Sequence, residues 1–396
     1  MKKIHIIGAG GVGMSALATL LVNQGHVVTG SDRTRGTINL KRLEELGVKI
    51  FPDDSSAIHE GLDEVIYSTA VEDGHPDMVA AEKLRIPTKH RAAALSETLR
   101  DKKLIAVAGT CGKSSVTALL GHILDYLSFD PVCVNGAGVV GWQGAVKFGN
   151  GEYAVAEVDE SDRSLVAFSP YAAIITNSSA DHYSKAEMDE VFDSFISKVS
   201  GPVLDARNEH YDAVDYISQN ESLAVRMAVM LGCDEHKAKQ ALLSFKGVER
   251  RLEKYSANVY DDYAHNPEKL RAMIAVLKKR HNGGLCVIWR PHGYGPLKKM
   301  MEQLATMFSL SLTSYDKLVL LPVYDAGGTA DRSVRSEDLA ALLPQELAKC
   351  VSSHEEAFKF VQSSLENFSC IVTAGARDHE LPALAKRIAE LKGEEI

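Results

Sequence analysis

The feature that most constrains this chain is a glycine-rich loop between an apolar run and a run with helical character. Residues 104–108 are apolar, the loop extends from Gly109 to Gly112, and Lys113 and Ser114 follow. Glycines let backbone N–H groups turn towards an anion, and the N-terminus of the next helix adds partial positive charge. A lysine and a hydroxyl at this point suit a polyphosphate and its Mg²⁺ ion. The pattern predicts an α/β domain that binds a nucleoside triphosphate.

The loop is a shorter form of the general phosphate-binding motif. The general motif has a glycine at the position of Val107, so this chain has the form Gly-Thr-x-Gly-Lys-Ser-Ser. The alternative is a plain glycine turn with an incidental lysine. The order of residues after a strand and before a helix favours phosphate binding.

Composition narrows the class of protein. The net charge is −9 and no lysine- or arginine-rich tract occurs, which argues against a nucleic-acid surface. The six cysteines show no C-x-x-C spacing, which favours reduced thiols over disulfides or a zinc site. Met1 leads directly into an apolar run too short for a signal peptide, and no run has membrane-spanning length. We therefore expect a cytoplasmic protein without a membrane partner.

A second glycine-rich turn lies near the start of the chain. Residues 3–7 are apolar, residues 8–13 read Gly-Ala-Gly-Gly-Val-Gly, and residues 14–21 have helical spacing. A second apolar run ends in Asp32, as in dinucleotide-binding folds. Any nucleotide diphosphate could occupy the same helix N-terminus, so the motif does not specify NAD. The alternative is that the glycines only let helix and strand pack closely.

Strand-like and helix-like runs alternate along the whole chain, which predicts the α/β class. Polar residues 100–103 separate the first alternating region from the second, and residue 246 begins a third. We predict three consecutive domains. They are an N-terminal Rossmann-like domain (1–102), a central P-loop ATPase-like domain with a parallel sheet (103–245), and a C-terminal Rossmann-like domain (246–396).

Carboxylates gather after the run at residues 153–158. Glu157, Asp159, Glu160 and Asp162 lie within six residues, and such a cluster is repulsive unless it holds a cation. A solvated acidic turn is the alternative. A third run, residues 172–176, is followed by His182. Because successive strands would bring Ser114, Glu157 and His182 to the carboxyl edge of one sheet, we predict a metal site there.

Two polar clusters flank a predicted strand in the third domain. Residues 246–253 contain Arg250 and Arg251, which could also form a solvated face. Residues 261–267 read Asp-Asp-Tyr-Ala-His-Asn-Pro, so a strand ends in polar groups before a helix that begins with proline. This arrangement is typical of a ligand-binding edge.

Together these segments resemble the Mur ligase family, the ATP-dependent amide-forming enzymes of peptidoglycan synthesis. Within it they are most similar to the branch that joins L-alanine to UDP-N-acetylmuramate. The resemblance covers nearly the whole chain. The segments that carry it are residues 8–15, 68–70, 109–115, 157–162, 181–182, 219–220, 247–253, 262–267 and 290–292.

The resemblance implies a role for each matched residue. The UDP substrate would be bound by Gly8, Gly10, Gly11, Val12, Gly13, Asp32, Ser68 and Thr69. ATP would be bound by Gly109, Thr110, Gly112, Lys113, Ser114, Ser115, Asn220, Arg251 and Asp262. Mg²⁺ would be held by Ser114, Glu157 and His182, and the amine substrate would lie near His265, Arg290 and His292. The catalytic residues would be Lys113, Glu157, His182 and His265.

The chain departs from the family pattern in three places. The stretch between His182 and Asn220 is short, which implies a shortened central domain. Gly293 follows His292 where the alanine-adding branch usually has an arginine, and the usual Ile-Glu-Pro before Asp181 is missing. The acceptor therefore stays open: L-alanine, another amino acid or a free peptide, as in muropeptide recycling. Two further alternatives are a ligase for an acid outside peptidoglycan and an inactive nucleotide-binding homologue. We expect a monomer or a homodimer.

Overall fold

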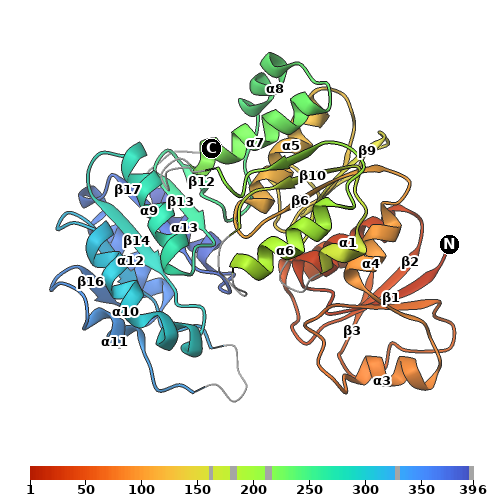
Figure 1. Ribbon diagram of the computed structural model, residues 1–396. Helices are drawn as coiled ribbons and strands as arrows, with labels where there is room; N and C mark the ends of the chain where they lie inside the picture. Colours follow the sequence, from red (N-terminus) through yellow and green to blue (C-terminus); the bar gives the residue numbers. More distant parts are fainter. Residues whose placement is uncertain (160–163, 179–184, 210–215, 326–330, 392–396) are drawn as a thin grey trace. The chain divides into compact units, whose positions relative to one another are not determined.

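The computed structural model describes residues 1–159, 164–178, 185–209, 216–325 and 331–391. The chain separates into two compact units, one of Met1–His210 with Ser218–Val248 and one of Tyr211–Ile217 with Glu249–Ile396. Three sheets follow one another along the sequence, two in the first unit and one in the second (Figure 1). The predicted α/β class with three consecutive sheets is confirmed.

The first sheet is entirely parallel and has the order β3-β2-β1-β4-β5. Its strands are β1 (Lys3–Ile7), β2 (Val27–Ser31), β3 (Lys49–Phe51), β4 (Glu64–Tyr67) and β5 (Thr88–His90). The helices of this domain are α1 (Val12–Asn23), α2 (Ile38–Glu45), α3 (Pro76–Lys83) and α4 (Arg91–Thr98). Strand β1 lies in the centre and is buried on both faces, which explains its continuous apolar run.

The second sheet has the order β11-β10-β6-β9-β7-β8, and only β8 runs antiparallel to its neighbour. Its strands are β6 (Lys103–Ala108), β7 (Val132–Val134), β8 (Val146–Lys147), β9 (Tyr153–Glu157), β10 (Ala172–Ile175) and β11 (Val203–Asp205). The helices are α5 (Lys113–Tyr126), η1 (Ser164–Ala167), α6 (Lys185–Ile196), α7 (Tyr216–Met230) and α8 (Glu235–Leu242). Between residues 185 and 209 the structure contains only α6 and the three-residue strand β11.

Side chains alternate between the two faces of the second sheet. Val107 of β6 and Val155 of β9 pack with α5, α7 and α8 in one apolar core. Ala106 and Ala156 face the other way, into a core that α6 shares with α1 and α4 of the first domain. Because alternate residues of a strand share a face, Glu157 at the end of β9 lies on the α5 side.

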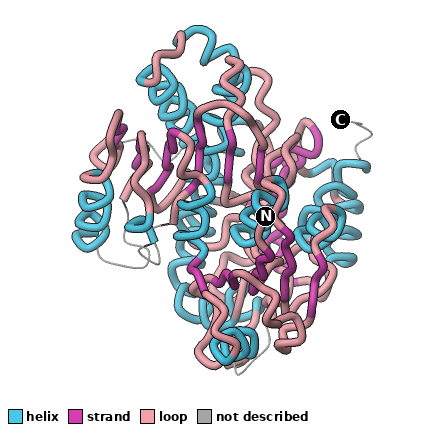
Figure 2. The backbone as a smooth tube through the Cα atoms, turned by 90° about the vertical axis from the view of Figure 1, so that its right-hand side faces the viewer, coloured by secondary structure: helices cyan, strands magenta, loops and turns pink. Residues whose placement is uncertain are grey.

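The third sheet has the order β12-β13-β17-β14-β15-β16, and only the pair β12–β13 is antiparallel. Its strands are β12 (Glu253–Ser256), β13 (Val259–Asp262), β14 (Leu285–Trp289), β15 (Lys317–Leu320), β16 (Ala348–Cys350) and β17 (Cys370–Ala374). The helices are α9 (Pro267–Arg280), α10 (Tyr294–Ser311), α11 (Ser336–Ala340), α12 (His354–Ser363), η3 (Leu365–Asn367) and α13 (Leu381–Leu391). Figure 2 shows strands, drawn in magenta, side by side with helices, drawn in cyan, around them. Tyr216 and Ile217 pack against the core of this unit, although they fall within the predicted range of the central domain.

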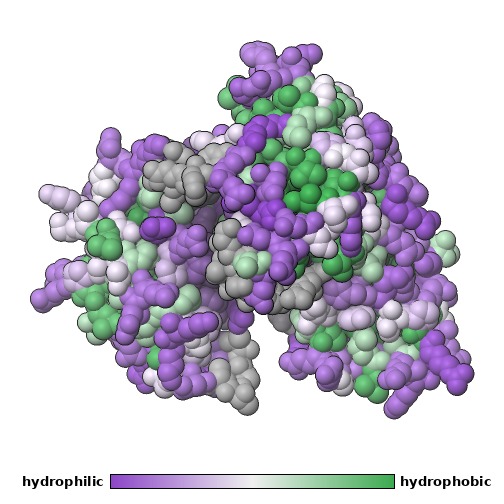
Figure 3. Space-filling view, in the orientation of Figure 1, coloured by the Kyte–Doolittle hydropathy of each residue, from purple (hydrophilic) through white to green (hydrophobic). Residues whose placement is uncertain are grey.

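The surface is mainly polar. Hydrophilic side chains predominate on the face drawn in Figure 3. Among the described helices, none combines the length and the apolar character needed to cross a bilayer.

Candidate active site

The phosphate loop connects β6 to α5 and depends on two glycines. Gly109 and Gly112 have φ angles of 125° and 86°, in a region that side chains rarely adopt. A Cβ on Gly109 would overlap the Thr176 hydroxyl, and a Cβ on Gly112 would lie 2.6 Å from the Asn220 side-chain oxygen. Asn220, predicted to bind ATP, therefore lies directly against the loop.

The loop is held by two residues that follow β10. The Asn177 side-chain oxygen accepts hydrogen bonds from the Cys111 N–H (2.9 Å) and the Thr110 hydroxyl (2.6 Å). The Asn177 amide and the Thr176 hydroxyl both donate to the Cys111 carbonyl, at 2.9 and 2.6 Å. Both polar groups of the Cys111 peptide are thereby bound, and the loop is ordered before any ligand arrives. Sequence analysis had not assigned a role to Thr176 or Asn177.

Lys113 and Ser114 open helix α5 at this loop. The Lys113 ammonium donates a hydrogen bond to the Gly109 carbonyl at 2.5 Å, so the Lys113 side chain extends back across the phosphate loop. Ser114 is buried in the first helical turn, with 7% of its surface exposed. The N-cap residue, Gly112, offers no side chain, and the first turn contains no acidic residue. The helix N-terminus therefore combines its partial positive charge with the Lys113 charge.

Glu157 lies on the same face and edge of the sheet as Ser114. Strands β10, β6 and β9 belong to one sheet and are parallel, as the sequence predicted, and the structure places them next to one another, so their carboxyl ends meet at one edge. A hydroxyl and a carboxylate are hard oxygen donors of the kind that Mg²⁺ prefers, so this donor set fits the ion that the sequence predicts. Asp159 is described, whereas Glu160, Asp162 and His182 lie outside the described residues. The predicted ligand His182 is thus not placed.

The first glycine turn is held by β2. The N–H groups of Gly8 and Ala9 donate to the Ser31 carbonyl at 2.8 and 3.0 Å. The Asp32 carboxylate accepts the N–H of Gly10 and the N–H of Thr34, each at 2.8 Å. Asp32 therefore orders the glycine turn in this structure, and its contact with a nucleoside stays a prediction.

Helix α1 presents an open N-terminus at this turn. It begins at Val12 after Gly11, without a side-chain cap and without an acidic residue in its first turn. Ser68 and Thr69 follow β4, whose strand is adjacent to β1, so they lie at the same carboxyl edge. These groups form a concentration of N–H and hydroxyl donors suited to an anion.

Arg91 is a further residue of this edge that sequence analysis missed. A Cβ on Gly13 would lie 3.1 Å from one terminal nitrogen of the Arg91 guanidinium. No carboxylate among the described residues pairs with Arg91. A cation beside the positive end of a helix is unfavourable unless an anion joins them. No local motif marks Arg91, because it reaches Gly13 only through the pairing of strands that are distant in sequence.

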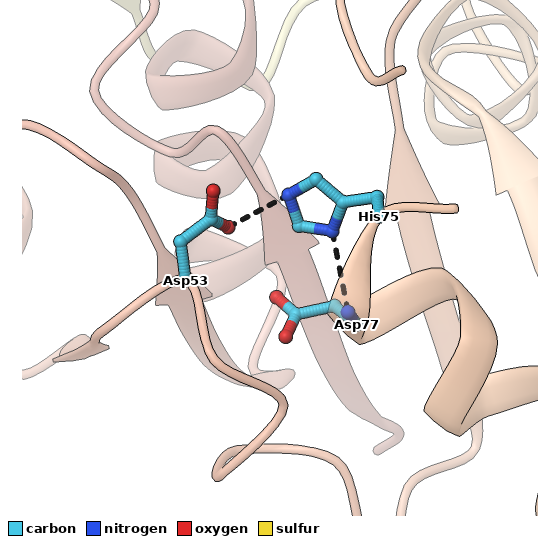
Figure 4. Close-up of side chains that lie close together, drawn as sticks. All are labelled: Asp53, His75 and Asp77. Carbon is cyan, nitrogen blue, oxygen red and sulfur yellow. Dashed lines mark hydrogen bonds and ion pairs between the residues drawn. The ribbon is translucent and has the colours of Figure 1, made fainter. Parts of the chain in front are cut away.

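A buried polar network lies behind the first glycine turn (Figure 4). The Asp77 N–H donates to His75 Nδ1 at 3.2 Å, so the ring proton is on Nε2, which lies 2.8 Å from an oxygen of Asp53. The Asp77 carboxylate in turn accepts the Ser31 hydroxyl at 2.5 Å and lies 3.4 Å from His5 Nε2. Although Asp53, His75 and Asp77 are close enough to surround an ion, protein partners occupy both ring nitrogens of His75. The network orders Ser31, whose carbonyl holds the glycine turn.

In the second unit, two residues predicted to bind ATP lie close together: Arg251 precedes β12, and Asp262 is the last residue of β13. Asp262 accepts the N–H of Leu252 (2.7 Å) and of Ala264 (2.8 Å), and burial raises its pKa. The Arg251 guanidinium lies 5.0 Å from the centre of the Tyr263 ring. Asp262 therefore shapes the turn that presents Arg251, and the roles of both residues towards ATP stay predictions.

His265 and His292 are in contact at the carboxyl edge of the third sheet. Their ring centres lie 4.9 Å apart in an edge-to-face arrangement. His265 Nδ1–H donates to the Tyr263 carbonyl at 3.0 Å, so Nε2 of the neutral ring is free of a proton. Burial, with a smaller contribution from Lys269, lowers the pKa of His265 to about 4. Burial and the Arg377 charge also lower the pKa of His292.

Arg290 is bound by protein groups in this structure. Its guanidinium donates to the Asp378 carboxylate at 2.8 Å and to the Pro322 carbonyl at 3.1 Å. His354 Nε2 lies 2.7 Å from the same Asp378 oxygen. The structure therefore brings His265 and His292 together but ties Arg290 to Asp378, and its predicted contact with a substrate stays a prediction.

Two sheets, one parallel and one parallel except for β8, each have a glycine turn at the carboxyl edge, and a third α/β region follows them. This arrangement defines a multidomain nucleotide-binding protein. A family model described as the Mur ligase family catalytic domain matches residues 3–103, and one described as the Mur ligase glutamate ligase domain matches residues 248–377. The chain belongs to the Mur ligase family.

Individual relatives agree with this assignment. The UDP-N-acetylmuramate–L-alanine ligases of Sulfurihydrogenibium sp. and Bdellovibrio bacteriovorus are each 30% identical, over 95% of this chain and 95% and 96% of theirs. The crystal structure of UDP-N-acetylmuramate-alanine ligase from Thermotoga maritima matches with a TM-score of 0.82 at 26% identity, over 99% of both chains. A murein peptide ligase from Psychrobacter arcticus shares the fold, with a TM-score of 0.65 at 19% identity. The first two alignments span 436 and 441 positions, more than the 396 residues of this chain, so parts of those relatives have no counterpart here.

Proposed function

We propose that this protein is an ATP-dependent, ADP-forming ligase of peptidoglycan precursor synthesis. It joins the carboxylate of a UDP-N-acetylmuramic-acid-type substrate to the amine of L-alanine, another amino acid or a peptide. The observation that carries the proposal is the preordered phosphate loop, with Lys113 and Ser114 on the same face of the sheet as Glu157. The names and full-length similarity of the relatives support the same reaction.

ATP would be bound at the phosphate loop, with Asn220 against it, and the family resemblance adds Arg251 and Asp262 to the residues that would bind it. Ser114, Glu157 and His182 would hold Mg²⁺, which neutralises charge on the phosphates when bound. A substrate carboxylate oxygen forms a bond to the γ-phosphorus while the bond to the β–γ bridging oxygen breaks and ADP leaves. Since both reactants are anionic, the Lys113 charge lowers the repulsion between them.

The UDP group would be bound at the first glycine turn. The open N-terminus of α1 donates N–H groups to the diphosphate, and Ser68 and Thr69 add hydroxyl donors. We propose that the positive charge of Arg91 balances the negative charge of the diphosphate, because the Arg91 guanidinium lies against Gly13 at this turn. Arg91→Ala should raise the KM for the UDP substrate about tenfold or more, as loss of a charge-assisted hydrogen bond does.

The second step requires a neutral amine. His265 stays uncharged at neutral pH, so its Nε2 can accept a hydrogen bond that orients the neutral amine. The amine nitrogen bonds to the activated carbonyl carbon, the bond from that carbon to the phosphate oxygen breaks, and the departing phosphate takes up the proton that the nitrogen loses. Lys269 and Arg377, whose charges act on His292, could pair with an acceptor carboxylate.

The test is phosphate release from ATP and Mg²⁺ with UDP-N-acetylmuramate, with L-alanine, other amino acids and the stem tripeptide added separately. Release that depends on one amine would establish the ligase and name its acceptor. Lys113→Ala should lower the rate on the order of 100-fold or more. Absence of release with every amine, from a protein that binds ATP, would refute the proposed acid substrate. We propose that the reaction takes place in the cytoplasm. The protein is predicted to be a monomer or a homodimer.

A further inference from the structure

Gly136, the second residue after β7, lies against the carboxylate of Glu157. Its N–H donates to one carboxylate oxygen of Glu157 at 2.7 Å. A Cβ on Gly136 would overlap both oxygens of that carboxylate. The φ angle of Gly136 is outside the left-handed region, so its backbone conformation does not require glycine. The space that Glu157 occupies is therefore what excludes a side chain at residue 136.

The peptide that donates this hydrogen bond is itself held in place. Asn135 is 2% exposed, its N–H donates to the Ala145 carbonyl at 2.9 Å, and its side-chain amide donates to the Ala137 carbonyl at 3.0 Å. Strand β7 pairs with β9 in the register Val134–Ala156, which brings the next residues of the two strands side by side. Gly136 thus presents a fixed donor to a glutamate whose three side-chain torsions would otherwise be free.

The donor orients Glu157 without neutralising it. Among the described residues no lysine, arginine or histidine forms an ion pair with Glu157. A backbone N–H binds one carboxylate oxygen and leaves the negative charge of the group in place. This combination, an oriented and uncompensated carboxylate beside a phosphate loop, is what a divalent cation requires of a ligand.

We propose that Gly136 is a positioning residue for metal binding: its N–H fixes Glu157 in the orientation that ligates the Mg²⁺ of ATP, an inference that rests on the proposed function. Loss of a group that orients a metal ligand typically costs about 10- to 100-fold in metal affinity. Gly136→Ala should therefore weaken metal binding by about this factor. Nucleotide affinity measured without metal should stay within about threefold, because Gly136 belongs to no part of the phosphate loop.

The experiment titrates the full chain with Mn²⁺ in the presence of a non-hydrolysable ATP analogue and follows the electron paramagnetic resonance signal of free Mn²⁺. The variants are Gly136→Ala, Glu157→Asp and the combination of both. Aspartate is shorter by one methylene and makes room for the new Cβ, so the double variant should bind Mn²⁺ no more weakly than Glu157→Asp alone. Gly201→Ala is the matched control, since its Cβ would lie 2.8 Å from the Tyr171 carbonyl near the opposite edge of the sheet.

A Gly136→Ala protein with Mn²⁺ affinity within twofold of the parent would overturn the proposal. So would an equal loss in Gly201→Ala, which would indicate general disturbance of the sheet. If Gly136→Ala does not fold, the double variant decides: recovery of folding and of Mn²⁺ binding at the level of Glu157→Asp supports the proposal, and failure to recover overturns it. The titration needs neither acid nor amine substrate, so its result is separate from the test of the ligase reaction.

Discussion

Asn177→Ala would show how far the phosphate loop is ordered by residues outside its motif. The Asn177 side chain makes three hydrogen bonds to Thr110 and Cys111, at 2.6 to 2.9 Å. Each contributes about 1 kcal/mol net, so their joint loss is about 3 kcal/mol when water replaces none of them. Water can reach the half-buried Cys111, so we expect a cost of about 1.5 to 3 kcal/mol.

This cost should appear mainly in nucleotide binding, because ATP must then order the loop itself. At about 1.4 kcal/mol per factor of ten, the dissociation constant for ATP should rise about 10- to 100-fold. Isothermal titration calorimetry with ATP and Mg²⁺ measures it directly. Thr176→Ser is the conservative control, since serine keeps the hydroxyl that donates to the Cys111 carbonyl, and its ATP affinity should change little. An Asn177→Ala protein that binds ATP within threefold of the parent would refute the reasoning.

Two further predictions concern pH. Burial raises the pKa of Asp77, but hydrogen bonds from His5 and Ser31 outweigh it and hold the pKa below its usual value. Ionised Asp77 therefore stabilises the fold above pH about 4, and this contribution is lost as pH falls through the depressed folded-state pKa. Asp77→Asn should lower the melting temperature more at pH 7 than at pH 3, and equal losses would contradict the network. Because His265 acts unprotonated and its pKa is lowered to about 4, the amine-dependent rate should be independent of its titration above pH about 5. His265→Gln should lower that rate on the order of 100-fold, because the amine is then misplaced relative to the activated carbonyl. An acid limb near pH 6.5, absent from His265→Gln, would refute the assignment.

Local sequence patterns predicted the central strands and their place in one parallel sheet. The apolar runs at residues 104–108, 153–158 and 172–176 correspond to β6, β9 and β10, which are adjacent in the sheet. Buried parallel strands require continuous apolar runs, and their connections are helical, so these features are encoded within short segments. The shortened stretch between His182 and Asn220 was inferred from the family resemblance, and it stays a prediction together with the domain boundaries.

Contacts between residues distant in sequence could not be predicted. Gly136 and Glu157 are 21 residues apart, and Arg290 and Asp378 are 88 apart. Each pair depends on which strands lie side by side, and no periodicity or motif within either segment records that choice. Arg290 illustrates the consequence, because it matched a substrate-binding motif and yet is paired with Asp378 in this structure.

The sequence by itself determined the class of fold, the two glycine turns and the chemical types at the carboxyl edges, since each depends on residues within one strand–turn–helix segment. The tertiary structure alone decided which groups hold those turns: Asn177 behind the phosphate loop, Asp32 and Ser31 behind the first glycine turn, and Gly136 against Glu157. The physical reason is that a turn is specified by local backbone conformation. The hydrogen bonds that order it come from strands that meet only when the sheet assembles.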